Sequence, residues 1–354
     1  MRHELKYLLA YLVPLVIFLS LYLRGIWSFL AIVTLFGLIP LIEQFQPGNT
    51  QNLDSNQENQ ARYNRWFDFL LYLNVPIQYG LLIYFLYIVK FQPLETYEMI
   101  VLTITMGMAC GSLGINVAHE LGHRSNKYEQ WMAKALLLTS MYMHFFIEHN
   151  RGHHKYVATP LDPATARKGE SLYHFWVRSI KGGFISAWNL ERKRLEKHNL
   201  PAHSLNNEMW QFMLIQGAFL LAIALGFGLI PLIAFVFAAL VGILELETVN
   251  YLEHYGLLRK EVREGVYERV QPHHSWNTNR PLGRILLYEL TRHSDHHYLA
   301  SRKYQVLRHF NESPQLPQGY PGMMVLALFP PLWFRIMNQL LKNEATCQQA
   351  DNLR

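Results

Sequence analysis

The chain has 354 residues, of which 51% are hydrophobic and 16% are charged, and its formal net charge is +6. Soluble domains carry about 25% charged residues, so this composition excludes an ordinary soluble protein and a disordered chain. It also excludes a bundle lying wholly within a membrane, because 26 of the 32 Lys and Arg residues fall in two polar blocks, 119–208 and 253–354.

Six stretches are long and apolar enough to cross a bilayer, whose core needs about 20 helical residues. The first is expected to remain as a span, because it is longer than the apolar part of a signal peptide and no small-residue cleavage site follows it. The sequence therefore predicts an all-α integral membrane protein with six transmembrane helices, at 5–23, 26–45, 66–90, 98–118, 211–228 and 231–252.

The positive charges predict which side of the membrane each polar block occupies. Arg2 and Lys6 place the N-terminus in the cytoplasm, and six spans return the C-terminus to the same side. Both basic blocks then lie there as a helical cap, and retention of positive charge on that side accounts for the net charge without a nucleic-acid partner. We expect four parts: helices 1–4 in 1–118, a cytoplasmic catalytic segment in 119–208, helices 5 and 6 in 209–252, and a second cytoplasmic segment in 253–354.

Two further apolar stretches are expected not to span. Residues 131–147 contain Lys134 and His144, and residues 320–341 contain three prolines and Arg335. Such segments are typical of helices that lie at the membrane interface or pack against the cap. The second stretch would provide a C-terminal interfacial helix.

Histidines are concentrated in the two polar blocks. Sixteen of the 17 lie at or after residue 119, and nine of these fall in four clusters, 119–123, 148–154, 250–256 and 292–297. Each cluster follows or ends a predicted span or lies in the cap. Only two cysteines are present, Cys110 and Cys347, which excludes a disulfide framework and a paired-cysteine metal site.

The spacing of these histidines indicates a metal site. Residues four apart in a helix share a face, and each such pair can bind one ion. Adjacent histidines diverge by about 100°, so one member of each adjacent pair can reach a second ion. Nine imidazoles exceed what one ion can bind, so a two-metal site of iron, copper or zinc is predicted. The four-apart pairs are 119/123, 149/153 and 293/297, and the adjacent pairs are 153/154 and 296/297.

Carboxylates commonly orient metal-binding imidazoles. Acidic residues close to a span also rarely lack a function. Supporting residues are therefore expected near the clusters, and the candidates are Glu120, Glu148, Glu247, Glu253, Asp295 and His274.

Two other chemistries fit part of the pattern. Residues His119-Glu120-x-x-His123 match the zinc metalloprotease motif, in which Glu120 would be the general base. That reading leaves the other three clusters unexplained. A haem site would need histidines facing each other within the membrane, whereas these gather outside the spans.

The histidine boxes H-x-x-x-H, H-x-x-x-H-H and H-x-x-H-H resemble those of the integral-membrane fatty acid desaturase and hydroxylase superfamily. Within it, residues 250–256 (NYLEHYG) and 292–297 (RHSDHH) are similar to the membrane-bound alkane 1-monooxygenases. The strings at 144–149, 158–163, 274–277 and 316–321 agree with that resemblance. It runs through most of the chain and is weakest in 1–60 and at the tail.

The resemblance implies a histidine-rich di-iron site and hydroxylation of the terminal methyl group of alkanes to primary alcohols with O2. It also implies six transmembrane helices in a bacterial inner membrane, with the active site facing the cytoplasm. The implied iron ligands are His119, His123, His149, His153, His154, His254, His293, His296 and His297.

The electrons are implied to come from rubredoxin, with rubredoxin reductase and NADH upstream. Because no paired cysteines follow the last histidine box, we expect that rubredoxin to be a separate protein. A dry channel among the spans would select chain length, and Leu35 is a candidate lining residue. The alternatives are a membrane fatty-acyl desaturase or hydroxylase, a xylene-type hydroxylase and the zinc metalloprotease.

Overall fold

The computed structural model describes the backbone of residues 4–351 and the side chains of residues 4–344. Arg2 and Cys347 therefore lie outside the described side chains. The described chain is mostly helical, as predicted. The exception is a short antiparallel hairpin, β1 (Glu261–Arg263) and β2 (Val266–Tyr267), which the sequence analysis did not anticipate.

Six helical stretches are long and apolar enough to span a membrane, which confirms the predicted number. Several are built from consecutive segments. They are Leu5–Leu23 (η1 Leu5–Tyr11, α1 Leu12–Leu23), Gly25–Phe45 (η2 Gly25–Phe29, α2 Leu30–Ile32, η3 Val33–Leu38, α3 Ile39–Phe45), Arg65–Phe91 (α5 Arg65–Tyr72, α6 Asn74–Phe91), Thr96–Gly122 (α7 Thr96–Ala109, η4 Cys110–Ile115, α8 Asn116–Gly122), α13 (Glu208–Phe227) and α14 (Leu229–His254).

The remaining elements form the cap. Polar residues begin its longer helices by accepting hydrogen bonds from the first backbone N–H groups, as N-caps do; Asn126 begins α9 and Ser171 begins α12. The cap elements are α4 (Ser55–Tyr63), α9 (Lys127–Leu138), α10 (Phe145–Glu148), η5 (His149–His153), α11 (His154–Tyr156), α12 (Leu172–Lys197), η6 (Pro272–His274), α15 (Pro281–Leu286), α16 (His293–Tyr298), η7 (Tyr304–Val306), α17 (Tyr320–Ala327) and α18 (Pro330–Asp351).

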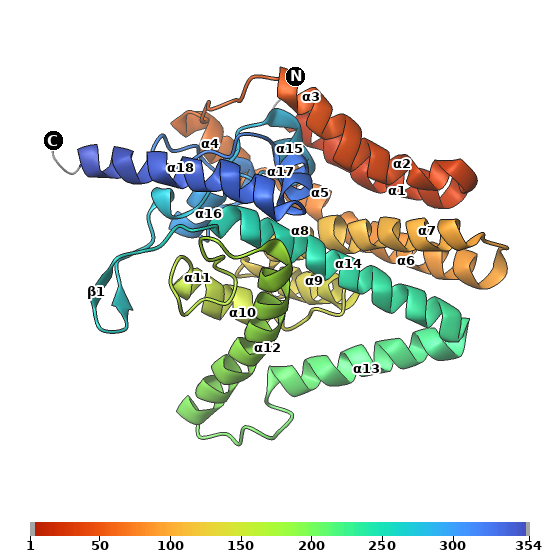
Figure 1. Ribbon diagram of the computed structural model, residues 1–354. Coiled ribbons are helices and arrows are strands. Elements are labelled where there is room, and N and C mark those ends of the chain that lie inside the picture. Colours follow the sequence, from red (N-terminus) through yellow and green to blue (C-terminus); the bar gives the residue numbers. More distant parts are fainter. Residues whose placement is uncertain (1–3, 352–354) are drawn as a thin grey trace.

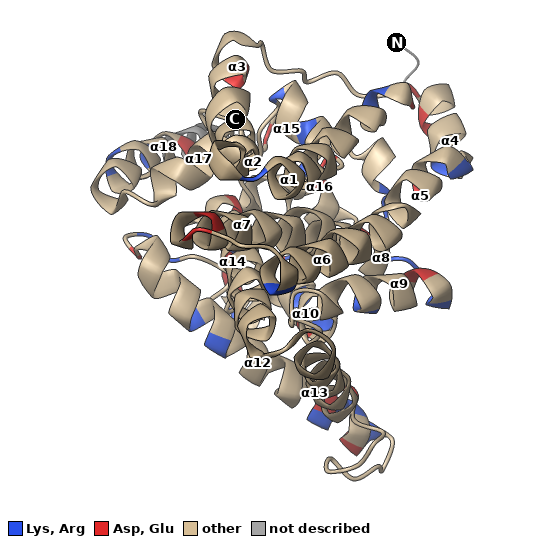
Figure 2. Ribbon diagram, turned by 90° about the vertical axis from the view of Figure 1, so that its right-hand side faces the viewer, with Lys and Arg blue, Asp and Glu red and all other residues tan. Residues whose placement is uncertain are grey.

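The spanning helices lie together at one end of the molecule and the cap covers the other. In Figure 1 the helices α1, α2, α6, α7, α13 and α14 extend to the right, and α10, α11, α16 and α18 lie to the left. Figure 2 shows few charged residues along the spanning helices, with acidic residues near α7 and on α3 as exceptions, whereas Lys, Arg, Asp and Glu gather on α4, α9 and α12. This separation is what an integral membrane protein requires.

The two doubtful apolar stretches do not span among the described residues. Residues 131–147 fold as the end of α9, a turn and the start of α10. Residues 320–341 form α17 and the first half of α18. Trp333 and Met337 of α18 are fully buried against the cap, while Leu332 and Ile336 are exposed. One face of α18 therefore packs against the cap while the other exposes apolar side chains, as a helix at the membrane interface does.

The fourth and sixth spans pack so closely that glycine is required between them. A Cβ atom added at Gly242 of α14 would lie 2.6 Å from the Cβ of Cys110 and 2.9 Å from the backbone nitrogen of Gly111. A Cβ at Gly107 would likewise overlap Val241. Small residues are the usual means by which membrane helices approach closely. This contact matters for the site, because α8 and α14 continue from it into the histidine clusters.

Replacing Gly242 with alanine should therefore destabilise the protein by about 1–3 kcal/mol, the usual cost of overpacking. Thermal unfolding of the purified protein in detergent measures the effect. Gly217→Ala on α13 is the matched control, because nothing lies within 4 Å of the added Cβ. Equal melting temperatures for the two variants would contradict the close packing.

Candidate metal centre

Nine histidines from five parts of the chain converge at the base of the fourth and sixth spans. The continuous helix Thr96–Gly122 carries His119 and ends next to His123, and α14 ends on His254. The cap supplies the others from η5, α11 and α16. The structure therefore brings together all nine histidines that the sequence analysis singled out.

Five of the rings form one group. Their ligand atoms all lie within 4.8 Å of one another. The Nε2 atoms of His119 and His296 are 2.8 Å apart, and those of His296 and His154 are 3.0 Å apart. Such inward convergence of ring nitrogens is the arrangement that binds a metal ion. The group consists of His119, His123, His149, His154 and His296.

The other four rings form a second group. Their ligand atoms meet the same 4.8 Å limit, and all four side chains are buried. The Nε2 atoms of His153 and His297 are 3.2 Å apart, and those of His254 and His293 are 3.1 Å apart. The adjacent pairs 153/154 and 296/297 are each divided between the two groups, as expected for neighbours that diverge on a helix.

One predicted pair is wrong. His149 and His153 were expected to share an ion because they are four residues apart, but they lie in different groups. The reason is that residues 149–153 form a π-helical turn, whose wider winding relates residue i to residue i+5. His154, rather than His153, therefore lies over His149, with 3.1 Å between their Nε2 atoms.

The environment keeps most of the rings neutral. Burial lowers the pKa of the His123 ring to about 3, and it also lowers the pKa of the rings at 149, 154, 293, 296 and 297. A neutral imidazole has the free lone pair that a metal ion needs. The Nδ1 atoms of His254, His293 and His297 are buried without a hydrogen-bond partner among the described residues.

His153 has a carboxylate partner that the sequence analysis missed. Burial opposes protonation of His153, but Asp162 outweighs it and raises the pKa of the ring. Asp162 Oδ2 lies 2.9 Å from His153 Nδ1 and accepts a second hydrogen bond from the Thr165 hydroxyl at 2.6 Å. This contact directs Nε2 of His153 towards its group. The only signal in the sequence was the string at 158–163, which contains Asp162.

The six supporting candidates lie around the centre, but only Glu253 contacts one of the rings directly. Its Oε2 lies 3.2 Å from His293 Nε2, and its Oε1 accepts a hydrogen bond from Tyr320. The hydrogen bonds of the others go elsewhere: Glu120 to Arg124 and Tyr304, Glu148 to Ser186, Glu247 to Tyr142, Ser179 and Asn250, Asp295 to Arg302 and Arg308, and His274 to Gln271.

The donor set fits a transition metal. Imidazole nitrogen suits iron, copper and zinc. Thiolate does not take part among the described side chains, since Cys110 is buried in the spans and donates to the Thr139 carbonyl. Two groups of buried nitrogens with converging Nε2 atoms therefore have the chemistry to hold two ions.

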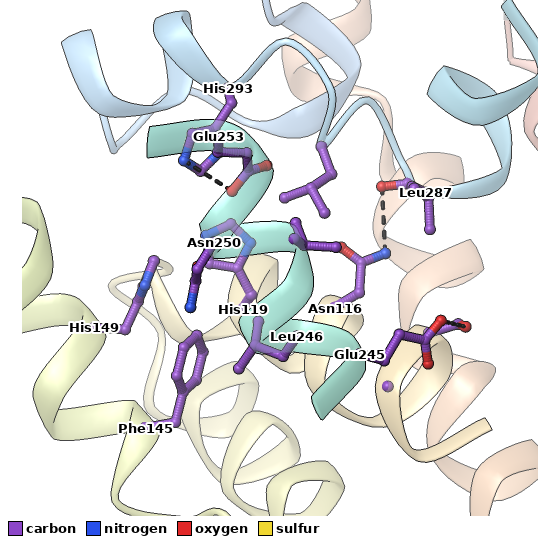
Figure 3. Close-up of a pocket in the computed structure, with 14 residues that line it drawn as sticks. Asn116, His119, Phe145, His149, Glu245, Leu246, Asn250, Glu253, Leu287 and His293 are labelled. Atoms are coloured by element: carbon purple, nitrogen blue, oxygen red, sulfur yellow. Dashed lines mark hydrogen bonds and ion pairs between the residues drawn. The ribbon is translucent and has the colours of Figure 1, made fainter. Parts of the chain in front are cut away.

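A narrow cavity of about 40 Å³ runs from the histidines into the spans (Figure 3). His119, His149 and His293 line one part of it. Its walls are formed by the fourth span, α10, α14 and the segment after α15, and include Phe145, Leu246, Val249, Leu287 and Leu290. Leu35 is buried in the core of the spans and is not among the lining residues, so the expectation that it lines the channel is wrong for this cavity.

The chain is similar to known membrane enzymes. Residues 96–327 match the family model described as fatty acid desaturase. The alkane 1-monooxygenase 1 of Alcanivorax borkumensis is 42% identical over 339 residues, covering 94% of this chain and 83% of that protein. The alkane 1-monooxygenase of Ectopseudomonas oleovorans is 41% identical, with 88% and 77% covered. The hydroxylase component of the Pseudomonas putida xylene/toluene monooxygenase is 28% identical, with 92% and 86% covered.

Proposed function

The chain belongs to the fatty acid desaturase family, among its alkane 1-monooxygenases, and we propose that its two histidine groups each hold an iron ion. It is an integral membrane oxidoreductase whose substrate is an alkane and which requires an electron donor. The observation that supports the proposal is the position of the two groups, which border an apolar cavity that enters the spans.

Iron bound by the nine imidazoles supplies activation of O2, so that one oxygen atom enters a C–H bond and the other leaves as water. The ligands in this proposal are the five-ring group 119, 123, 149, 154 and 296 and the four-ring group 153, 254, 293 and 297. Seven of these rings are buried and His123 and His154 are partly buried, which limits the access of water to the reacting carbon.

The rest of the site positions a substrate that has no polar handle. Phe145, Leu246, Val249 and Leu290 form an apolar wall beside the rings, so an alkane is oriented by shape and by exclusion of water. An alkane that enters this cavity end-on presents its terminal methyl group to the rings. Hydroxylation there gives a primary alcohol.

The rival functions are not favoured. The similarity to the xylene/toluene enzyme is lower than that to the alkane 1-monooxygenases. A zinc protease would need Glu120 as a free base, but this carboxylate accepts hydrogen bonds from Arg124 at 2.6 Å and from the Tyr304 backbone at 3.2 Å. The relatives that cover most of the chain at about 40% identity are alkane 1-monooxygenases, which disfavours an acyl desaturase or hydroxylase.

We also propose that the donor is a rubredoxin, reduced by rubredoxin reductase and NADH. In this proposal the protein lies in a bacterial inner membrane. The blocks 119–208 and 253–354, both termini and the metal centre face the cytoplasm, where the donor is present. The excess of Lys and Arg in those blocks supports this orientation.

Metal analysis combined with turnover tests the function. The purified protein should contain two iron ions per chain and should convert linear alkanes to 1-alkanols with O2, rubredoxin, rubredoxin reductase and NADH. One zinc ion per chain and no oxygen-dependent product would overturn the proposal.

Narrowing the cavity should shorten the alkanes that the enzyme accepts. Leu246→Trp is expected to lower kcat/KM for the longest accepted alkanes by about tenfold or more, because each methylene excluded from an apolar site has an effect of that size. Product analysis over a graded alkane series measures the shift. Leu240→Trp is the control, since Leu240 lies on the same helix and is exposed on the apolar surface. The same shift in both variants would count against the position of the cavity.

The basic cap predicts an effect of salt on electron transfer. Complementary charge accelerates association with an acidic donor and is screened by salt. Raising the ionic strength should therefore raise the KM for rubredoxin several-fold while alkane binding stays the same. A donor KM that is independent of salt would remove the electrostatic part of the proposal.

A further inference from the structure

An acidic side chain lies in the sixth span, beyond the histidines. Glu245 is on α14, eight residues before Glu253. At 1.5 Å per residue the backbone of Glu245 lies about 12 Å deeper in the span than the backbone of Glu253, whose carboxylate contacts His293. Ionisable residues within spans are costly and generally mark a functional site.

The Glu245 carboxyl group has almost no hydrogen-bonding partner. Its Oε2 is buried without one among the described residues. Its Oε1 is 3.5 Å from the Ser112 hydroxyl, at the outer limit for a hydrogen bond. The Ser112 hydroxyl already donates to the Met108 carbonyl at 2.7 Å. The carboxyl group therefore has hydrogen-bonding capacity that the protein does not use.

The backbone holds this group in place. A Cβ atom added at Gly111 would overlap Glu245 Oε2, so the absence of a side chain there leaves the space that the carboxyl group occupies. Gly111, Ser112 and Glu245 all line the same cavity as His119 and His293. In Figure 3 Glu245 lies on the opposite side of the lining set from His149.

The cavity thus changes character along its length. The rings form one end, and the wall beyond them is mainly apolar, with Leu246, Val249 and Leu290 beside the amides of Asn116 and Asn250. The other end carries the unsatisfied carboxyl group. A buried polar group of this kind favours a ligand that supplies the missing hydrogen bond. An alkane cannot supply it, whereas a chain with a hydroxyl group at one end can.

We propose that Glu245, together with Ser112, forms a hydrogen-bonding subsite for the hydroxyl group of a primary alcohol, so that the enzyme hydroxylates the far methyl group and yields an α,ω-diol. This inference rests on the proposed function. The alcohol is bound with its oxygen away from the rings, which directs the reaction to the methyl carbon and away from the carbon that already bears oxygen.

The reaction balances as the alkane reaction does. A C–H bond of the terminal methyl group breaks and a C–O bond forms with one atom of O2. The other oxygen atom leaves as water, with two electrons from the donor and two protons. The competing reaction, at the carbon that carries the hydroxyl group, gives an aldehyde instead. The ratio of diol to aldehyde therefore reports how the alcohol is bound.

The wild-type enzyme provides the first test, with a 1-alkanol, its methyl ether and the alkane of equal length as probes. The alkanol should give mainly the diol. The ether, which has no O–H to donate, should lose the preference for its far methyl group. A wild-type enzyme that hydroxylates alkanes but makes only aldehyde from alkanols overturns the inference alone. One that hydroxylates neither overturns the proposed function, and with it the inference.

Variants provide the second test. Glu245→Leu should lower the diol-to-aldehyde ratio by about tenfold, the factor that one ordinary hydrogen bond supplies. Gly111→Ala, which displaces the carboxyl group without removing it, should act in the same direction. Glu245→Gln keeps a hydrogen-bonding group and should retain most of the ratio. Val236→Ala, at an exposed position on the same helix, is the control. An unchanged diol-to-aldehyde ratio in Glu245→Leu would mean that Glu245 only joins two spans. The same conclusion would follow if turnover of alkane and alkanol fell equally while that ratio stayed constant.

Discussion

Replacing His254 with alanine should remove one of the two metal ions and almost all activity. His254 belongs to the four-ring group, so the variant leaves three imidazoles for an ion that had four. Loss of a residue that merely orients a metal ligand already costs about 10–100-fold, so removal of a ligand should lower turnover by at least about 100-fold. Iron analysis should fall from two ions per chain to about one.

The two groups should differ in their response to the loss of one ring. His123→Ala leaves four imidazoles in the five-ring group, which is the number that the other group has when intact. We therefore expect His123→Ala to retain more metal than His254→Ala. Equal metal loss in the two variants would contradict the division into five and four.

A buried histidine outside both groups provides the control. His144 is 8% exposed, and its Nε2 has no hydrogen-bond partner among the described residues. His144→Ala should lower stability by leaving a space but should keep both ions. If His254→Ala kept two ions and full turnover, the assignment of the four-ring group as a metal site would be wrong.

The hydrophobic pattern of the sequence was sufficient to predict the spans. Runs of about 20 apolar residues have few alternatives to a membrane helix. The predicted number of six agrees with the structure. The ends were less accurate, because the fourth span continues as a helix to Gly122 and the sixth to His254. Histidines and glutamates at those ends interrupt the hydropathy signal without interrupting the helix.

The histidines could be found from their spacing, and so could most of their division, but the partner of His149 could not. The expectation that residues four apart share a face assumes an α-helix. Residues 149–153 form a π-helical turn, so His149 meets His154 and not His153. Such a turn depends on surrounding contacts rather than on a sequence pattern. The hairpin at 261–267 was missed for a related reason, since two strands of three and two residues are too short to show alternation.

The supporting residues were the hardest to predict. Proximity in sequence favoured Glu120, Glu148 and Asp295, which adjoin histidines, yet their hydrogen bonds go mainly to residues other than the rings. Asp162, nine residues from His153, makes the closest carboxylate contact to a ring. A loop determines that contact, and loop geometry leaves little periodic signal.

Replacing Asp162 with asparagine should lower turnover by about 10–100-fold, the usual effect of losing a carboxylate that orients a metal-binding imidazole. In the native protein Asp162 accepts the Nδ1 proton of His153, which directs Nε2 into the four-ring group. An asparagine can accept that proton only with its oxygen in one orientation, and it loses the negative charge. Steady-state kinetics and iron analysis measure the effect.

The control separates loss of a charge from loss of this contact. Asp68 is also partly buried, and its carboxylate pairs with Lys303 at 2.9 Å rather than with a ring. Asp68→Asn should keep turnover near that of the wild type, with at most a small loss of stability. The Thr165 hydroxyl donates to the same oxygen of Asp162 as His153 does, so an asparagine with its oxygen in that position keeps the Thr165 contact and loses only the one from the Ala164 N–H, and the loop should stay folded. An equal loss of turnover in the two variants would show that Asp162 acts through the stability of the protein. A loss confined to Asp162→Asn would show that Asp162 acts through its contact with His153.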